Sequence, residues 1–244
     1  MEQSWKTYIG ELLKRNKTAQ CGELVLIFGI SLGLIIALFV PMVGKNQMLV
    51  QLVVWTANMV LIFLVWFSQW LRGESLSELG LQGISFRWKA IARNLLISLL
   101  ILVLGLLAFQ SGLLLMPVPA KDLSPEISVN YDYLKQNPAI LILSLLGVYM
   151  VSSFGEELVY RGYLINRLSQ LFGESKSGKL LAAITSAIIF GAIHYQWGFT
   201  GMVQTSLMGL VFALAFIIMK NRLLPLILAH AFMDTILLVS IYYN

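Results

Sequence analysis

The chain has 244 residues, of which 58% are hydrophobic and 12% are charged. This composition is too apolar for an ordinary soluble domain and predicts a protein of the lipid bilayer. The formal net charge is +5, but the basic residues stand in short tracts between long apolar runs, which argues against a nucleic-acid partner. Cys21 is the only cysteine, so an intramolecular disulfide is excluded.

A membrane-spanning helix needs about 20 mostly apolar residues, and the sequence offers seven candidates. They run approximately over 22–41, 48–71, 94–116, 139–154, 180–193, 200–219 and 223–243. We therefore predict an all-α fold, a polytopic membrane helical bundle of about seven transmembrane helices, with an eighth left open. A cytoplasmic N-terminal segment, 1–21, would precede a single transmembrane helical domain, 22–243.

The distribution of Lys and Arg between alternate loops predicts the orientation, because these residues resist translocation. With the N-terminus inside, the cytoplasmic loops hold Lys6, Lys14, Arg15, Lys17, Arg72, Arg87, Lys89, Arg93, Arg167, Lys176, Lys179, Lys220 and Arg222. The outer loops hold only Lys45, Lys121 and Lys135. We expect a multi-pass protein with a cytoplasmic N-terminus. This pattern, without a targeting segment, suits a bacterial plasma membrane.

Ionisable residues and both histidines of the chain gather in its second half, within or beside the apolar runs. They are Glu156, Glu157, Arg161, His194, His230 and Asp234. Each costs a few kcal/mol to remove from water, so such residues usually face a cavity and carry function. The first three candidate spans, by contrast, have no acidic, basic or histidine residue in their interiors.

Three pairs of residues stand four positions apart, one helical turn: Glu157 with Arg161, Phe190 with His194, and His230 with Asp234. The first pair predicts an intrahelical ion pair, which leaves Glu156 about 100° away around the helix and free. In the second pair, an aromatic ring would pack beside the imidazole and restrict its rotamer. The third pair places two polar side chains on one helix face.

The depths of these groups agree only if the fourth helix continues beyond its apolar run. His194 lies about 21 Å in from Leu180 at 1.5 Å per residue, whereas Glu156 would lie at the surface if the helix ended at Phe154. We therefore predict a long fourth helix that extends to about Leu171. His230 would need its helix to begin deeper or to tilt.

A glutamate and a histidine in an intramembrane cavity are suited to activating water for peptide hydrolysis. A second imidazole can stabilise the oxyanion of a tetrahedral intermediate. Alternatively, Glu156, His194 and His230 would be the ligands of a catalytic zinc, as in a metalloprotease. The sequence lacks the zinc-binding motif His-Glu-x-x-His, so nothing in it requires a cofactor. A bound zinc is an alternative that the sequence allows.

The order Glu-Glu-x-x-x-Arg, Phe-x-x-x-His and His-x-x-x-Asn or Asp resembles the CPBP family of CAAX prenyl proteases and bacteriocin-processing or immunity proteins, also called the Abi family. The resemblance covers about 133–243, and the first three spans match only in hydrophobic character. It implies that Glu156 and His194 activate water and that His230 and Asp234 form the oxyanion side. Glu157 and Arg161 would be structural support.

Two details of the site depend on neighbouring polar residues. An ionised aspartate at position 234 would repel an oxyanion, so we expect Asp234 to orient His230 as a hydrogen-bond acceptor instead. Ser152 and Ser153 are interpreted as residues of a helix-packing face and not as nucleophiles.

The favoured function is that of an intramembrane endopeptidase whose partners are the bilayer and a peptide or prenylated protein, with the oligomeric state left open. One alternative is a non-catalytic membrane protein for immunity or scaffolding. A proton-coupled transporter is a further alternative, although the paired broken helices typical of transporters are not found in the sequence.

Overall fold

A computed structural model describes residues 5–39, 47–82, 85–115 and 131–243 of the chain. Within these ranges the chain is helical and has no strand. The α-helices and the π-helical segments η5 and η6 are α1 (Trp5–Arg15), α2 (Lys17–Phe39), α3 (Gln47–Arg72), α4 (Trp88–Leu114), α6 (Pro138–Val148), η5 (Tyr149–Phe154), η6 (Glu157–Ile165), α7 (Asn166–Phe172), α8 (Lys176–Ala192), α9 (Gly198–Ile218) and α10 (Leu224–Tyr243). The predicted all-α bundle is confirmed.

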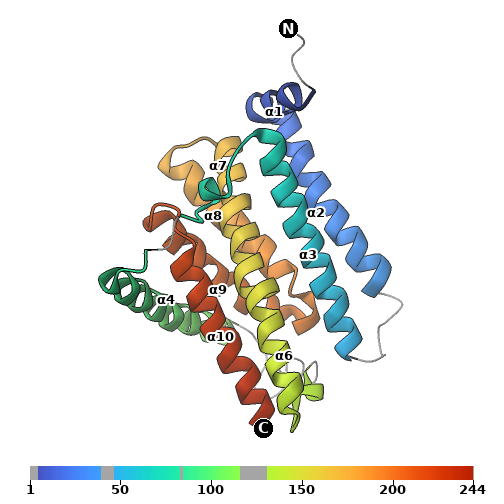
Figure 1. Ribbon diagram of the computed structural model, residues 1–244, viewed down its shortest axis with the longest axis vertical. Helices are drawn as coiled ribbons and strands as arrows, with labels where there is room; N and C mark the ends of the chain where they lie inside the picture. Colours follow the sequence, from blue (N-terminus) through green and yellow to red (C-terminus); the bar gives the residue numbers. More distant parts are fainter. Residues whose placement is uncertain (1–4, 40–46, 83–84, 116–130, 244) are drawn as a thin grey trace.

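The apolar runs become helices at the predicted places. Six of the described helices are long and apolar enough to cross a membrane. The remaining predicted span, 180–193, corresponds to α8, which has 17 residues. The amphipathic helix α1, in the segment assigned to the cytoplasm, was not predicted and packs against α2 and α3 (Figure 1).

The long fourth helix is confirmed. It runs without a break from Pro138 to Phe172, passing through α6, η5, η6 and α7. Its middle portion is π-helical on both sides of Gly155 and Glu156. Single π-turns are rare and occur frequently at functional sites. This helix lies at the centre of the bundle, with α2 and α3 on one side and α8, α9 and α10 on the other (Figure 1).

Residues 73–82, which follow α3, pack against the fourth helix. This segment contains a short 3-10 helix, η2 (Leu76–Leu79), and Leu79 is fully buried. Gly162 permits this contact, because a Cβ there would lie 2.7 Å from the Leu79 carbonyl oxygen. The backbone N–H of Leu223 donates to the Gly80 carbonyl oxygen at 3.1 Å. Helix α10 therefore begins against buried protein, at Leu224, close to the predicted start of the last span.

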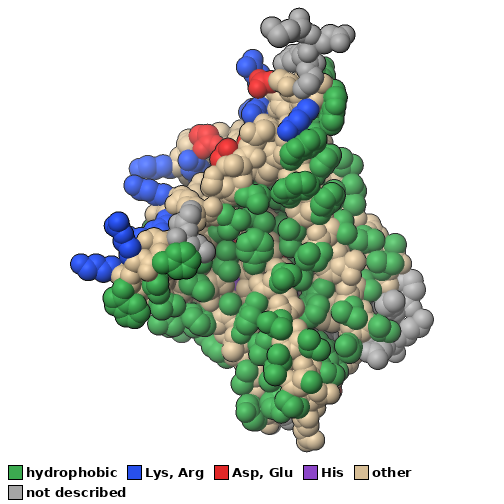
Figure 2. All heavy atoms as spheres, viewed as in Figure 1, with side chains coloured by type: hydrophobic (Ala, Val, Ile, Leu, Met, Phe, Trp, Pro, Cys, Tyr) green, Lys and Arg blue, Asp and Glu red, His purple; other side chains and the backbone are tan. Residues whose placement is uncertain are grey.

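The exterior of the described chain is largely apolar, as a bilayer requires. Figure 2 shows hydrophobic side chains over most of the visible face, with Lys and Arg along the upper left edge, from α1 to the vicinity of α4. Most side chains on α2 that point away from the bundle are apolar and exposed, such as Val25 (73%). The long apolar helices and this exterior establish a multi-pass membrane protein.

Two arginines assigned from the sequence to the cytoplasmic surface are instead buried. Arg72 and Arg167 are each 2% exposed. Arg72 Nε donates to Glu23 Oε1 at 3.0 Å, and Arg167 forms an ion pair with Glu74. This charged cluster joins α2 and α3 to α7. Its partners lie far apart in the sequence, which is why the spacing of charges did not reveal it.

Candidate active site

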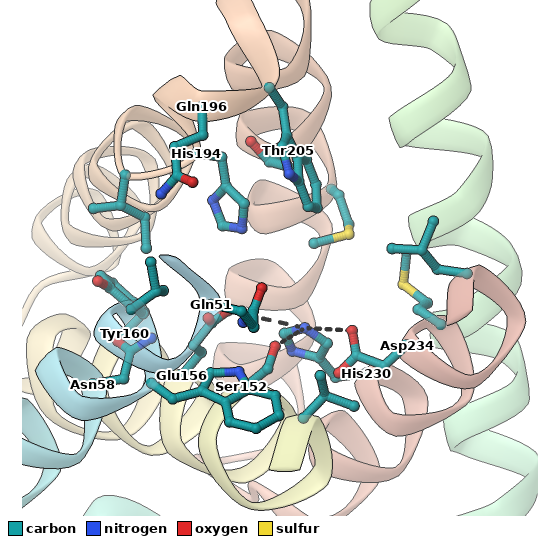
Figure 3. A pocket seen from close by; sticks show the side chains of 18 of the residues that line it. Gln51, Asn58, Ser152, Glu156, Tyr160, His194, Gln196, Thr205, His230 and Asp234 are labelled. Carbon is teal, nitrogen blue, oxygen red and sulfur yellow. Dashed lines mark hydrogen bonds and ion pairs between the residues drawn. The ribbon is translucent and has the colours of Figure 1, made fainter. Parts of the chain in front are cut away.

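A cavity of about 370 Å³ opens among α2, α3, α4, the fourth helix, α9 and α10. The four residues predicted to be catalytic all line this cavity: Glu156, His194, His230 and Asp234. Figure 3 shows Glu156 and His230 on one side of the cavity, with His194 on the opposite side. The structure therefore brings together residues from three helical regions, as the three motifs predicted.

His194 ends the helical run of α8 and has a defined tautomer. Its Nδ1 lies 2.7 Å from the Phe190 carbonyl oxygen. Because a carbonyl oxygen can only accept, Nδ1 carries the proton, and Nε2 of the neutral ring is an acceptor. The Phe190 ring packs beside the imidazole with centroids 4.8 Å apart, and Trp197 packs on it at 4.9 Å. The Phe190 ring therefore lies beside the His194 imidazole, as their spacing of four residues predicted.

Glu157 and Arg161 form the predicted intrahelical ion pair, with Oε1 and Nη1 separated by 3.1 Å. Both side chains are almost fully buried. The guanidinium also lies 4.2 Å from the centroid of the Phe190 ring, a cation–π contact. Arg161 thus balances a buried carboxylate and braces the aromatic ring that supports His194.

Glu157 has a second contact that the sequence did not predict. Its Oε1 accepts a hydrogen bond from Nδ1 of His230 at 2.8 Å. The expectation that Asp234 orients His230 is not met, because Asp234 Oδ1 lies 3.9 Å from Nε2, beyond hydrogen-bond distance. The i,i+4 spacing brings Asp234 near the ring, but the fourth helix presents Glu157 directly to its other nitrogen.

The two remaining carboxylates lie on the Nε2 side of His230. Glu156 Oε2 is 4.0 Å from Nε2. Glu156 takes no part in the Glu157–Arg161 ion pair, as the helical spacing predicted, and the His230 imidazole lies between the two glutamates. Glu156 Oε2 is enclosed and has no hydrogen-bond partner among the described residues. The Glu156 side chain nevertheless lines the cavity, so its carboxylate lies beside the space that a water or a substrate would occupy.

Ser152 and Ser153 contact the site and are not merely packing residues. Ser153 Oγ donates to Asp234 Oδ2 at 2.7 Å, and Ser152 Oγ lies 3.4 Å from His230 Nε2. The π-helical turns of η5 are wider than α-helical turns and bring both serines toward α10. The sequence offered only their closeness to the glutamates as a signal. Asp234 is thus held by a serine and not by its own helix.

A phenol from outside the membrane-spanning helices completes one wall of the cavity. Tyr131 lines it near α10. Burial raises the pKa of the Tyr131 phenol, and the nearby Tyr133 and the carboxylates Asp234 and Glu156 raise this pKa further. Tyr131 is therefore a neutral hydroxyl group that can donate a hydrogen bond.

The positions of the acidic and histidine side chains do not fit a metal centre. No group of three His, Cys, Asp or Glu side chains in the described ranges lies close enough together to hold a metal ion. His194 and the Glu156–His230 pair face each other across the cavity (Figure 3). The zinc ligand set of Glu156, His194 and His230 is thus not assembled among the described residues.

These observations define a class: a polytopic helical membrane protein with a buried carboxylate and histidine site in an intramembrane cavity. Residues 138–236 match the family model described as "Rce1-like: Type II CAAX prenyl endopeptidase Rce1-like". This segment contains all three motifs and is similar to that family, which supports the resemblance to CAAX prenyl proteases. Comparison with curated proteins and with solved structures gives no match. The family supports peptidase activity in general.

Proposed function

We propose that this protein is an intramembrane endopeptidase that hydrolyses a peptide bond with a water activated by Glu156 and His194. The observation that carries the proposal is the cavity, which is lined by both the carboxylate side chain of Glu156 and the imidazole of His194, whose Nε2 is an acceptor. A water needs two such acceptors for its two protons. The family match is independent support for peptide hydrolysis.

The reaction follows from these acceptors. Glu156 takes one proton from the water while the water oxygen attacks the carbonyl carbon of the scissile bond. His194 Nε2 accepts the hydrogen bond of the second water proton and holds the nucleophile in position. Collapse of the tetrahedral intermediate breaks the C–N bond, and Glu156 returns the proton to the leaving nitrogen.

His230 is suited to stabilising the oxyanion of that intermediate. Because Nδ1–H is engaged by Glu157, Nε2 can donate only when the ring carries its second proton. The carboxylates of Glu156, Glu157 and Asp234 surround the ring and favour the cation by Coulomb attraction. The imidazolium then donates from Nε2 to the oxyanion. Ser153 donates a hydrogen bond to Asp234 and thereby stabilises its carboxylate.

The substrate class that we infer is a peptide with an apolar, membrane-embedded attachment. The cavity wall is mostly apolar on the α2 and α4 sides, where Leu32, Ile35, Leu106 and Phe109 line it. The family description names a CAAX prenyl endopeptidase, and a prenylated C-terminal segment has this chemistry. The protein would reach such a substrate from within the bilayer.

We also propose that the basic end of the bundle faces the cytoplasm of a bacterial plasma membrane. The visible Lys and Arg side chains lie along one edge of the molecule, from α1 to the vicinity of α4 (Figure 2), and such residues favour the cytoplasmic side. Protease protection of tags placed at each end of the chain in sealed vesicles would test the orientation.

The function is tested with the purified protein in liposomes and a farnesylated Cys-a-a-X peptide. Mass spectrometry should detect release of the residues that follow the modified cysteine, and a Glu156→Gln variant should release none. If the wild-type protein bound the peptide without cleaving it, a scaffold function would replace the proposal.

A further inference from the structure

Helix α3 presents two amide side chains to the cavity. Gln51 and Asn58 line it together with Trp55, and their spacing of four and three residues places all three on one helix face. Figure 3 shows both amides in the group around Glu156 and Ser152. This helix lies outside the segment that matches the family model, and the sequence provided no reason to assign it to the site.

Two glycines of the fourth helix hold α3 in a defined register. A Cβ at Gly147 would lie 2.1 Å from the Trp55 ring, and one at Gly155 would lie 2.5 Å from Ile62 Cδ1. Such contacts are impossible for any other residue without movement of the neighbour. Gly155 directly precedes Glu156, so α3 packs closely against the fourth helix beside the proposed general base.

The fold does not use these two amides. Neither Gln51 nor Asn58 has a side-chain hydrogen-bond partner within the described ranges, and both are half-buried. Thr56 of the same helix, in contrast, faces outward and donates to the carbonyl oxygen of Leu52 at 2.8 Å. A polar amide inside a membrane span is unfavourable unless it is hydrogen-bonded. Its retention on the cavity face therefore points to a ligand.

The separation of the amides matches the repeat of an extended peptide. Seven residues of α-helix span about 10.5 Å, and three residues of extended chain span about 10 Å. We propose that Gln51 and Asn58 bind the backbone of the substrate and hold it extended along α3, with contacts about three positions apart in the peptide. This inference rests on the proposed endopeptidase function and identifies the groups that position its peptide.

The test uses Gln51→Leu and Asn58→Leu, with Thr56→Val as a matched polar-to-apolar control on the outer face of α3. Cleavage of the farnesylated Cys-a-a-X peptide is measured for each protein. Loss of one hydrogen bond should raise KM about 3- to 10-fold while kcat stays near the wild-type value. The control should change neither constant, and unchanged KM in both leucine variants would overturn the proposal.

A series of peptides, each N-methylated at one backbone nitrogen, adds a readout that a structural role would not move. For one peptide of the series, N-methylation should raise the KM of the wild-type protein by the same factor as one of the two leucine substitutions does. The same peptide should cause no further rise in KM with that leucine variant. Additive effects at every position would overturn the backbone contact. If the wild-type protein did not cleave the peptide, the proposed function would fail, and fluorescence anisotropy with the same peptides would still decide the inference.

Discussion

One carboxylate oxygen joins the fourth helix to α10 at the centre of the site. Glu157 Oε1 lies 2.8 Å from Nδ1 of His230 and 3.1 Å from Nη1 of Arg161. The resemblance to the family implies that Glu157 has a supporting role in the site, and the geometry identifies what Glu157 supports. Glu157 orients the ring that we propose to stabilise the oxyanion, and Arg161 balances the charge of Glu157.

Glu157→Ala should lower kcat about 10- to 100-fold, as for other outer partners of a functional histidine, with little change in KM. Glu157→Gln should retain more activity, because its amide oxygen can still accept from Nδ1. Steady-state kinetics with the prenylated peptide measure both effects. Wild-type kcat in Glu157→Ala would show that His230 does not need this contact.

Asp234→Asn should change kcat by no more than a few-fold. The asparagine oxygen can still accept from Ser153, and loss of the negative charge has two opposing effects: it removes repulsion of the developing oxyanion and weakens the Coulomb attraction that favours the His230 cation. The kcat of this variant, compared with that of Ser153→Ala, measures the effect. Complete loss of cleavage in a folded Asp234→Asn protein would mean that the carboxylate itself takes part in the reaction.

Chelation should leave activity unchanged, because the described acidic and histidine residues do not converge on a metal position. The measurement is the cleavage rate before and after incubation of the purified protein with EDTA and 1,10-phenanthroline, followed by metal analysis. Loss of activity that zinc restores would instead support a metalloprotease.

Arg72→Met should destabilise the protein more than a surface substitution does. Removing one partner of a buried ion pair costs about 3–5 kcal/mol, because the other charge, here Glu23, is left unpaired. Arg15→Met, which removes an exposed ion pair with Glu11, is the control and should change stability little. Thermal unfolding in detergent compares the two, and equal midpoints would contradict the importance of the cluster.

Much of the fold could be predicted from the sequence, because each membrane-spanning helix consists of a continuous run of apolar residues. The depth argument also predicted the long fourth helix, since Glu156 and His194 could otherwise not meet. The partner of His230 was not predictable in this way. Asp234 is its neighbour by helical spacing, whereas Glu157 is 73 positions away and reaches it only through packing.

Other parts of the site left no local signal. Gln51 and Asn58 are ordinary amides in an apolar span, and only the packing of α3 against Gly147 and Gly155 places them in the cavity. The π-helical turns that direct Ser152 toward His230 likewise depend on tertiary contacts, because sequence periodicity assumes 3.6 residues per turn.

The central claim is that Glu156 activates the water. The most direct measurement is the single-turnover cleavage rate of Glu156→Gln with a saturating prenylated peptide, alongside His194→Ala and His230→Ala and with binding of the peptide measured separately. We predict that all three variants fold and insert, that Glu156→Gln binds the peptide with near wild-type affinity, and that its cleavage is abolished. Cleavage by Glu156→Gln at the wild-type rate would contradict the mechanism.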